Sequence, residues 1–184
     1  MLKLKIPPQQ YTLEKPNGEV VFGNFKGGVL QLEHSLISLS KWESLYKKPF
    51  LSSTNKTMKE SIDYIKCMTI NNNVDPMIYM FIRDEHISEI NKYIEDPHTA
   101  TFFAEDGMKT GRNRIITSEL IYYWMIALNI PVKFETWHIH RLLALIRVCE
   151  IESTPKKKRG GKRMSPDERH RINMARRAAR HSTG

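Results

Sequence analysis

Histidine is the side chain in this sequence most able to do chemistry, because a neutral imidazole binds metal ions and exchanges protons near neutral pH. His138 and His140 follow Trp137 in a segment predicted to be helical, and such a pair suggests a metal site. Side chains two positions apart on a helix point in different directions, however, and no third ligand follows at a workable spacing. The pair therefore predicts two histidines at the surface or boundary of a helix. His98 stands beside Thr99, but the sequence marks no nucleophile or base to act with it.

Other signatures of catalysis are missing from the sequence. There is no GxxxxGK[ST] loop for phosphates and no GxGxxG fingerprint for dinucleotides, and residues 105–107 are not a complete calcium loop. Cys67 and Cys149 are far apart, without a CxxC pair, and both lie in apolar helical surroundings. We expect them to be buried free thiols in a reducing compartment. The sequence therefore predicts no enzyme, no cofactor and no metal site.

Three consecutive aromatic residues, Tyr122, Tyr123 and Trp124, are the strongest candidates for contact with a partner. Consecutive residues on a helix span about 200° of its circumference, so the three side chains cannot all face one core. At least one of them is expected at a boundary or an interface. Two alternatives stay open: a helix buried on most sides, or a protein–protein contact anchored by Tyr and Trp.

The net charge is confined to the end of the chain. Of the 29 Lys and Arg residues, 11 lie in residues 155–184, where only Asp167 and Glu168 oppose them; the remaining 18 are balanced by 18 acidic residues. A neutral body with a cationic arm predicts binding to a polyanion or an acidic partner. The alternative is a solvated arm that aids solubility. The arm contains no Phe, Tyr or Trp, so base stacking on single strands is not expected from it. Its expected contact residues are Lys156, Lys157, Lys158, Arg159, Lys162 and Arg163.

The elements that position these residues are predicted to be mainly helical. Within residues 1–33, the segments 2–6 and 30–33 alternate apolar and polar side chains, and Asn17-Gly18 is a hairpin signal, so two or three strands are expected there. Residues 98–116 are expected to form a long loop. The predicted helices cover residues 41–48 after a Ser40 cap, a stretch from a capping box at Thr57, a short segment 77–82 after Asp75-Pro76, a stretch capped by Asp84, 119–128 after Ser118, 137–149 after Thr136, and a stretch from Ser165 to about Arg180.

At 184 residues, the chain is expected to hold a single helical domain, placing it in the mainly α class. The predicted parts are an N-terminal β element at 1–33, the helical domain at 34–150, a basic flexible linker at 151–164 and a basic C-terminal helix or tail at 165–184. No secretory signal is visible, and the longest apolar stretch, 120–130, is too short to span a bilayer. We therefore expect an intracellular soluble protein without membrane contact.

From about residue 28 onward, the sequence resembles a family of tailed-bacteriophage proteins that are encoded among the virion morphogenesis genes and are called tail assembly chaperones. A basic, Ala/Arg-rich C-terminus ending in Gly adds to the similarity. The segments that carry the resemblance are Leu30–Ser44, Lys48–Leu51, Tyr64–Met68, Thr99–Phe103, Ile116–Met125 and Trp137–Leu143.

This resemblance implies a non-enzymatic protein that binds the tape measure protein or tail-tube subunits while the tail is built. It places the protein in the host cytoplasm during infection or in the virion, with homo-oligomers as a further option. One alternative is a structural virion protein of the tail or head–tail region, whose basic arm contacts DNA non-specifically or an acidic neighbouring subunit. Another is a nucleic-acid regulator that uses 118–149 as a helix-turn-helix, but the second of those helices is mostly apolar and offers few base-reading side chains.

Overall fold

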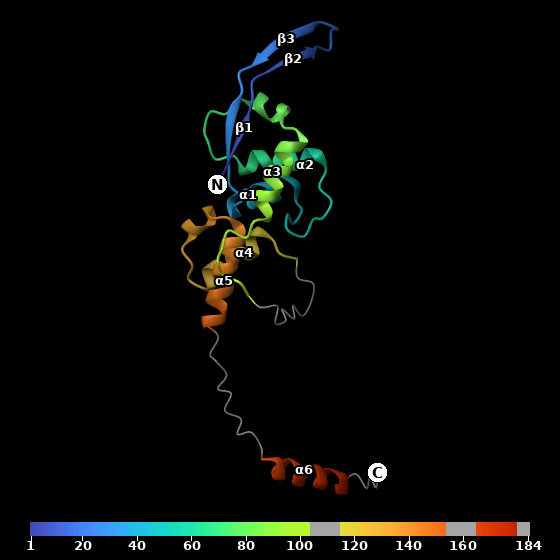
Figure 1. Ribbon diagram of the computed structural model, residues 1–184, viewed down its shortest axis with the longest axis vertical. Coiled ribbons are helices and arrows are strands. Elements are labelled where there is room, and N and C mark those ends of the chain that lie inside the picture. The colour runs from blue at the N-terminus through green and yellow to red at the C-terminus, as the bar shows by residue number, and fades with distance from the viewer. Residues whose placement is uncertain (104–114, 154–164, 180–184) are drawn as a thin grey trace. The chain divides into compact units, whose positions relative to one another are not determined.

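The computed structural model describes residues 1–103, 115–153 and 165–179, whereas 104–114, 154–164 and 180–184 lie outside the described residues (Figure 1). The chain divides into two compact units, Met1–Ile151 and Glu152–Gly184. The first unit contains the strands and every helix up to α5, and the second contains α6. The described chain is mainly helical with a small β element.

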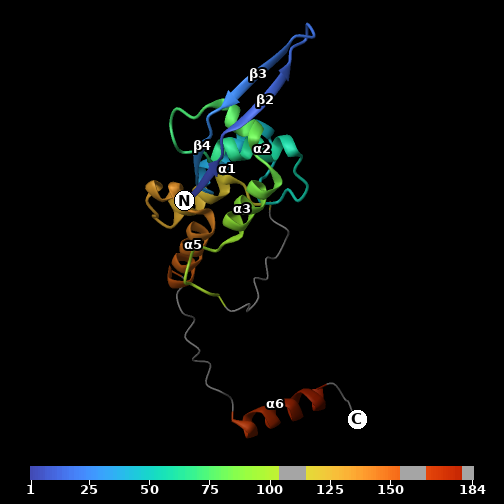
Figure 2. The ribbon, with the colours of Figure 1, turned by 45° about the horizontal axis from the view of Figure 1, so that its top comes forward.

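The β element has four strands where two or three were predicted. β1 (Leu2–Ile6) pairs antiparallel with β4 (Gly28–Leu32), and β2 (Gln9–Glu14) pairs antiparallel with β3 (Val20–Phe25). The two pairs form separate two-stranded sheets. The Asn17-Gly18 signal is confirmed, because Gly18 lies in the turn between β2 and β3 with a φ of 80°. β2 and β3 extend away from the helices of the first unit in both views (Figure 1 and Figure 2).

Helix α1 (Leu36–Tyr46) begins five residues earlier than predicted. Ser35 is its N-cap, and the Ser35 Oγ accepts a hydrogen bond from the Ser38 N–H. The predicted Ser40 cap is wrong because Leu36 and Leu39 are fully buried in the core, so the apolar face of the helix starts before that serine. Lys47 ends α1 in the left-handed conformation, with a φ of 56°.

The next three helices lie close to their predicted places. α2 (Met58–Met68) begins after the predicted capping box of Thr57 and Glu60. The 3-10 helix η1 (Pro76–Phe81) follows the Asp75 cap. α3 (Asp84–Glu95) has Arg83 as its N-cap, so Asp84 is the first helical residue rather than the cap.

The predicted helical hairpin exists, but both of its caps differ from the prediction. α4 (Ser118–Ala127) has Thr117 as its N-cap, so Ser118 already belongs to the helix. A 3-10 helix, η2 (Val132–Thr136), occupies the place of the predicted Thr136 cap, and α5 (Ile139–Ser153) starts two residues later than expected. On α5, Leu142 and Ile146 are buried, whereas Leu143, Leu145 and Cys149 are only half-buried.

α1 lies at the centre of the first unit, where it contacts α2, α4 and η2. Its Trp42 is fully buried, and the indole Nε1–H donates a hydrogen bond to the Glu60 backbone oxygen at 3.0 Å. Other fully buried side chains are Leu4, Ile6, Leu30, Leu32, Leu36, Leu39, Met68, Ile90, Ile121, Met125 and Ile139. Cys67 and Cys149 are free thiols but only half-buried, so the prediction that both are buried is wrong.

In the second unit, α6 is described over Pro166–Ala179, and the predicted end at about Arg180 lies outside the described residues. Its predicted start is confirmed: the Glu168 N–H donates to the Ser165 Oγ at 3.1 Å, and the Ser165 N–H donates to the Glu168 Oε2 at 3.2 Å. Among the described helices of both units, none is long and apolar enough to cross a membrane.

Candidate functional site

A buried glutamate of α1 holds the start of α4, the helix that carries the aromatic triplet. Glu43 is 7% exposed. Its Oε1 accepts a hydrogen bond from the Phe50 backbone N–H at 2.8 Å, and its Oε2 accepts one from the Ser118 N–H at 2.7 Å. Ser118 is the first residue of α4, where backbone N–H groups lack partners within the helix. One side chain therefore connects the segment after α1 to the beginning of α4.

The three consecutive aromatic residues of α4 have different surroundings. Tyr122 is half-buried, and its hydroxyl donates a hydrogen bond to the Glu135 Oε2 at 2.7 Å. Burial, followed by this bond to a carboxylate, raises the pKa of Tyr122. Trp124 is half-buried against the core, whereas Tyr123 is 61% exposed. One aromatic side chain of the three thus lies on the surface.

Ile126 lies one turn after Tyr123 on the same side of α4 and is 70% exposed. The inner side of the helix buries Ile121 and Met125. An exposed Tyr and Ile at an i, i+3 spacing form a small apolar face beside a fixed helix backbone. The membership of Ile126 in this face was not predicted from the sequence, although its i, i+3 spacing from Tyr123 can be read there.

One exposed apolar side chain and two half-buried aromatic rings lie at the neighbouring η2 segment. Val132 is exposed, and the Phe134 ring stacks on the Trp137 ring with centroids 4.2 Å apart. The Arg141 guanidinium lies 4.1 Å from the centroid of the Trp137 ring, a cation–π contact. The bond between Tyr122 and Glu135 joins α4 to η2. We define the α4–η2 surface as the exposed side chains Tyr123, Ile126, Val132 and Arg141 together with the half-buried Trp137, which follows η2.

Four histidines that are distant in the sequence meet at one junction of the first unit. The ring centroids lie 5.1 Å apart for His34 and His138, 4.2 Å for His98 and His138, and 5.3 Å for His138 and His140. The prediction that His138 and His140 point apart as neighbours on a helix is wrong. α5 begins at Ile139, so His138 lies in extended backbone before it. We call His34, His98, His138 and His140 the histidine junction.

Backbone pairing brings the histidine junction together. Ser35 and His138 form an antiparallel bridge, and the Ile139 N–H donates to the His34 carbonyl oxygen at 2.7 Å. The His138 Nε2 lies 3.2 Å from the Tyr93 carbonyl oxygen, and the His34 Nδ1 is hydrogen-bonded to the Tyr64 hydroxyl. The junction therefore ties the starts of α1 and α5 to α2 and α3.

The electrostatics of the junction favour neutral rings. Burial, followed by the other histidines, lowers the pKa of His34 to about 3 and that of His138 to about 4. The His138 Nδ1 is buried and has no hydrogen-bond partner among the described residues. The described part of the chain contains no group of three or more His, Cys, Asp or Glu arranged to hold a metal ion. At neutral pH the rings of His34 and His138 are therefore uncharged.

The remaining predicted contact residues are in parts of the chain that the structure leaves undescribed. Lys156, Lys157, Lys158, Arg159, Lys162 and Arg163 lie outside the described residues, as do positions 104–114 of the predicted 98–116 loop. At the described edge of that loop, the Arg147 guanidinium lies 4.1 Å from the centroid of the Phe103 ring. The N-terminal part of this loop therefore contacts α5.

Comparison with known proteins gave no match. No protein-family model matches the chain, and no curated protein or solved structure is significantly similar to it. The side chains described above and the sequence resemblance are therefore the grounds for a function.

Proposed function

We propose that this protein is a non-enzymatic assembly factor of a phage tail, which binds the tape measure protein or tail-tube subunits through the α4–η2 surface. The observation that carries the proposal is the exposure of Tyr123 and Ile126 on a helix whose opposite side is fixed in the core. The sequence resemblance to tail assembly chaperones supplies the class of partner.

The surface has the composition of a protein-binding site. Tyr, Trp and Arg are the residues most enriched among those that carry the energy of protein interfaces, and Tyr123, Trp137 and Arg141 are all present. Burying an apolar side chain the size of Ile126 contributes about 1.5–3 kcal/mol relative to leaving it exposed. A tape measure protein is a long helical chain with apolar stripes before the tube closes around it. An amphipathic helix of that kind lays its apolar face against another apolar surface.

The start of α4 is held in place by Glu43, which binds its first residue, and the inner side of the helix is held by the burial of Ile121 and Met125. The partner would therefore meet a preformed face, so little of the binding free energy is spent on ordering it.

The test is co-expression of the full chain with its cognate tape measure protein, followed by measurement of soluble complex. We expect the double variant Tyr123→Ser/Ile126→Ser to leave the tape measure protein insoluble, whereas the wild-type chain keeps it in solution. The matched control is Leu45→Ser, because Leu45 is similarly exposed but lies on α1. A double variant that folds normally and still keeps the tape measure protein soluble would contradict the proposal.

A second candidate, a structural protein of the tail or head–tail region, is favoured by the exposed arginines of α6. In that case the basic arm contacts DNA or an acidic neighbouring subunit inside the particle. Mass spectrometry of purified virions separates the two candidates. A transient assembly factor is missing from finished particles, whereas a structural protein is present in a fixed number of copies.

A further inference from the structure

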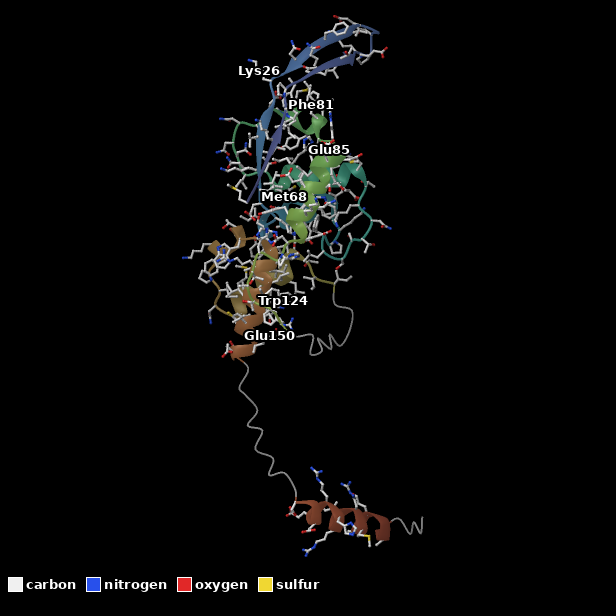
Figure 3. The ribbon with its side chains drawn as sticks, viewed as in Figure 1. Lys26, Met68, Phe81, Glu85, Trp124 and Glu150 are labelled. Atoms are coloured by element: carbon white, nitrogen blue, oxygen red, sulfur yellow. The ribbon has the colours of Figure 1, made fainter. Side chains whose placement is uncertain are left out.

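α6 is a helix without an apolar face. Among its described side chains, only Ile172 is half-buried, and Met174 is exposed like the polar residues around it. Side chains extend from the helix on all sides (Figure 3). A helix of this composition is not held in place by hydrophobic packing, which is what stabilises most helices in proteins. Its sequence must serve another purpose.

The charges of α6 are segregated along its length. Asp167 and Glu168 lie in the first turn, where acidic side chains complement the helix dipole. Arg169, Arg171 and Arg176 follow, and all three are exposed. After its first turn, therefore, the described part of the helix carries only positive formal charge.

Two of these arginines share one side of the helix. Arg169 and Arg176 are seven positions apart, which is two turns and about 10 Å along the axis. Together with Ile172 and Asn173 they line a hollow on the helix surface. Because Asn173 lines the same hollow, its side-chain amide adds a further donor on that side. Arg171 extends on the opposite side of the helix.

We infer that α6 binds the phosphate backbone of duplex nucleic acid. This inference rests on the second candidate function, which it deepens by naming the ligand and the residues, and it uses a different part of the chain from the α4–η2 surface. Guanidinium groups present several donors in a planar fork that matches phosphate oxygens, and amide side chains also bind phosphates. With charges on the duplex spaced about 1.7 Å apart along its axis, the span from Arg169 to Arg176 covers several phosphates.

The composition of α6 disfavours the other polyanions. Single-stranded nucleic acid is bound largely by stacking on aromatic side chains, and residues 165–184 contain none of Phe, Tyr or Trp. An acidic protein partner would require apolar anchors at the centre of the interface, and α6 offers only Ile172 and Met174. A duplex backbone requires neither stacking nor apolar anchors.

The test measures binding of the full chain to a fluorescent DNA duplex of arbitrary sequence, about 25 base pairs long, between about 50 and 200 mM NaCl. The variant Arg169→Gln/Arg171→Gln/Arg176→Gln removes three positive charges. If all three contact phosphates, the slope of log K against log salt becomes shallower by about 2.7. Over this fourfold range of salt, the variant then loses about 40-fold less affinity than the wild-type chain.

A matched control removes the same charge elsewhere. Lys41→Gln/Lys59→Gln/Lys92→Gln neutralises three exposed lysines of the first unit, so both triple variants have equal net charge. We expect the control to keep the wild-type slope, and Arg169→Lys/Arg171→Lys/Arg176→Lys to keep most of the affinity. Either of two results would overturn the inference. One is a loss of affinity for the duplex in the lysine control equal to that in the arginine variant. The other is competition by poly-glutamate as strong as competition by unlabelled duplex at equal charge. The co-expression test of the α4–η2 surface probes a different part of the chain and is independent of both results.

Discussion

The Oε2 atom of Glu43 in α1 accepts a hydrogen bond from the backbone N–H of Ser118, the first residue of α4, at 2.7 Å. The second carboxyl oxygen accepts from the Phe50 N–H. All three residues of this contact are buried. The helix with the exposed Tyr123 and Ile126 is thus positioned by a side chain 75 residues away in the sequence.

Replacing Glu43 should destabilise the first unit. Glu43→Ala leaves two buried N–H donors without acceptors, each of which costs about 1–3 kcal/mol, so we expect a loss of about 2–6 kcal/mol in the free energy of unfolding. Glu43→Gln keeps one carbonyl acceptor and should lose less. Urea unfolding followed by circular dichroism measures both. Equal stabilities for the wild-type chain and Glu43→Ala would show that the two bonds contribute nothing net.

The histidine junction should make the protein sensitive to mild acid. Because the pKa values of His34 and His138 are lowered in the folded state to about 3 and about 4, the unfolded chain binds more protons as the pH falls below about 6.5. The stabilising effect of the neutral rings is complete above that pH and is lost as the pH drops toward the folded-state values. In this pH window, each of the two histidines makes the free energy of unfolding fall by up to about 1.4 kcal/mol per pH unit as the pH is lowered.

Urea midpoints at pH 7, 6 and 5 measure this dependence. We expect His34→Gln to flatten it, and His170→Gln, an exposed position on α6, to leave it unchanged. Charged groups that face the junction include Lys56, Glu33 and Asp96. A wild-type chain whose stability is constant from pH 7 to pH 5 would rule out the effect.

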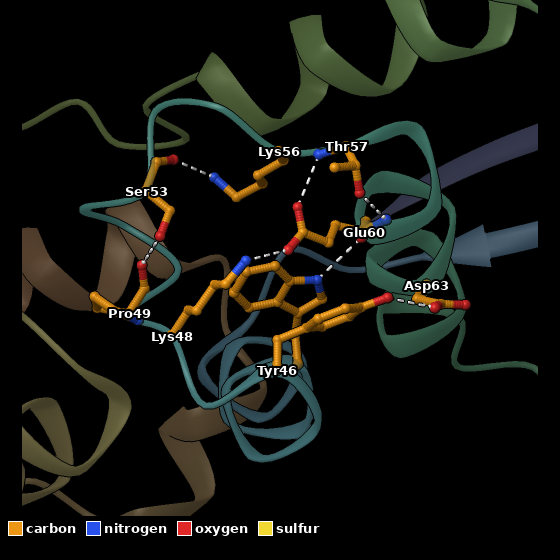
Figure 4. Close-up of polar contacts among 9 residues, drawn as sticks. Tyr46, Lys48, Pro49, Ser53, Lys56, Thr57, Glu60 and Asp63 are labelled. Atoms are coloured by element: carbon orange, nitrogen blue, oxygen red, sulfur yellow. Dashed lines mark hydrogen bonds and ion pairs between the residues drawn. The ribbon is translucent and has the colours of Figure 1, made fainter.

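The capping box of α2 should contribute measurable stability. The Thr57 Oγ1 accepts from the Glu60 N–H at 3.2 Å, and the Glu60 Oε2 accepts from the Thr57 N–H at 2.8 Å, while Lys48 binds the other carboxyl oxygen of Glu60 (Figure 4). Thr57→Ala should lower the free energy of unfolding by about 1 kcal/mol, because an N-cap acceptor is removed. Thr57→Ser retains that acceptor and serves as the control. The prediction fails if the serine and alanine variants unfold at the same denaturant concentration.

Two glycines with similar backbone angles should respond differently to substitution. Gly27 has a φ of 78°, and a Cβ there would lie 2.8 Å from the Ile6 carbonyl oxygen; Gly18 has a φ of 80° with open space around it. Gly18→Ala should therefore lower the free energy of unfolding only by the cost of placing alanine in the left-handed conformation, about 1–2 kcal/mol. Gly27→Ala adds a steric clash with backbone and should cost clearly more. Thermal unfolding of the two variants makes the comparison, and equal shifts in Tm would contradict it.

Local signals in the sequence predicted local structure well. The Thr57–Glu60 and Ser165–Glu168 capping boxes and the Asn17-Gly18 turn all depend on residues within a few positions of one another, so the folded environment had little to add. The predicted start of α1 was wrong by five residues, because Ser35 and Ser40 are equally good N-caps when each is considered in isolation. Burial of Leu36 and Leu39 in the core decided between them.

By itself, the sequence determined the mainly helical class, the charge asymmetry and the helix starts that are encoded by adjacent residues. Only the tertiary structure decided which side chains meet. The four histidines are far apart in the sequence, at positions 34, 98, 138 and 140. The approach of His34 to His138 and His140 depends on the pairing of Ser35 with His138. The exposure of Tyr123 between two partly buried aromatic neighbours depends in the same way on the packing of α4 against α1. Contacts between distant segments form only when the whole core closes, and no short stretch of sequence encodes them.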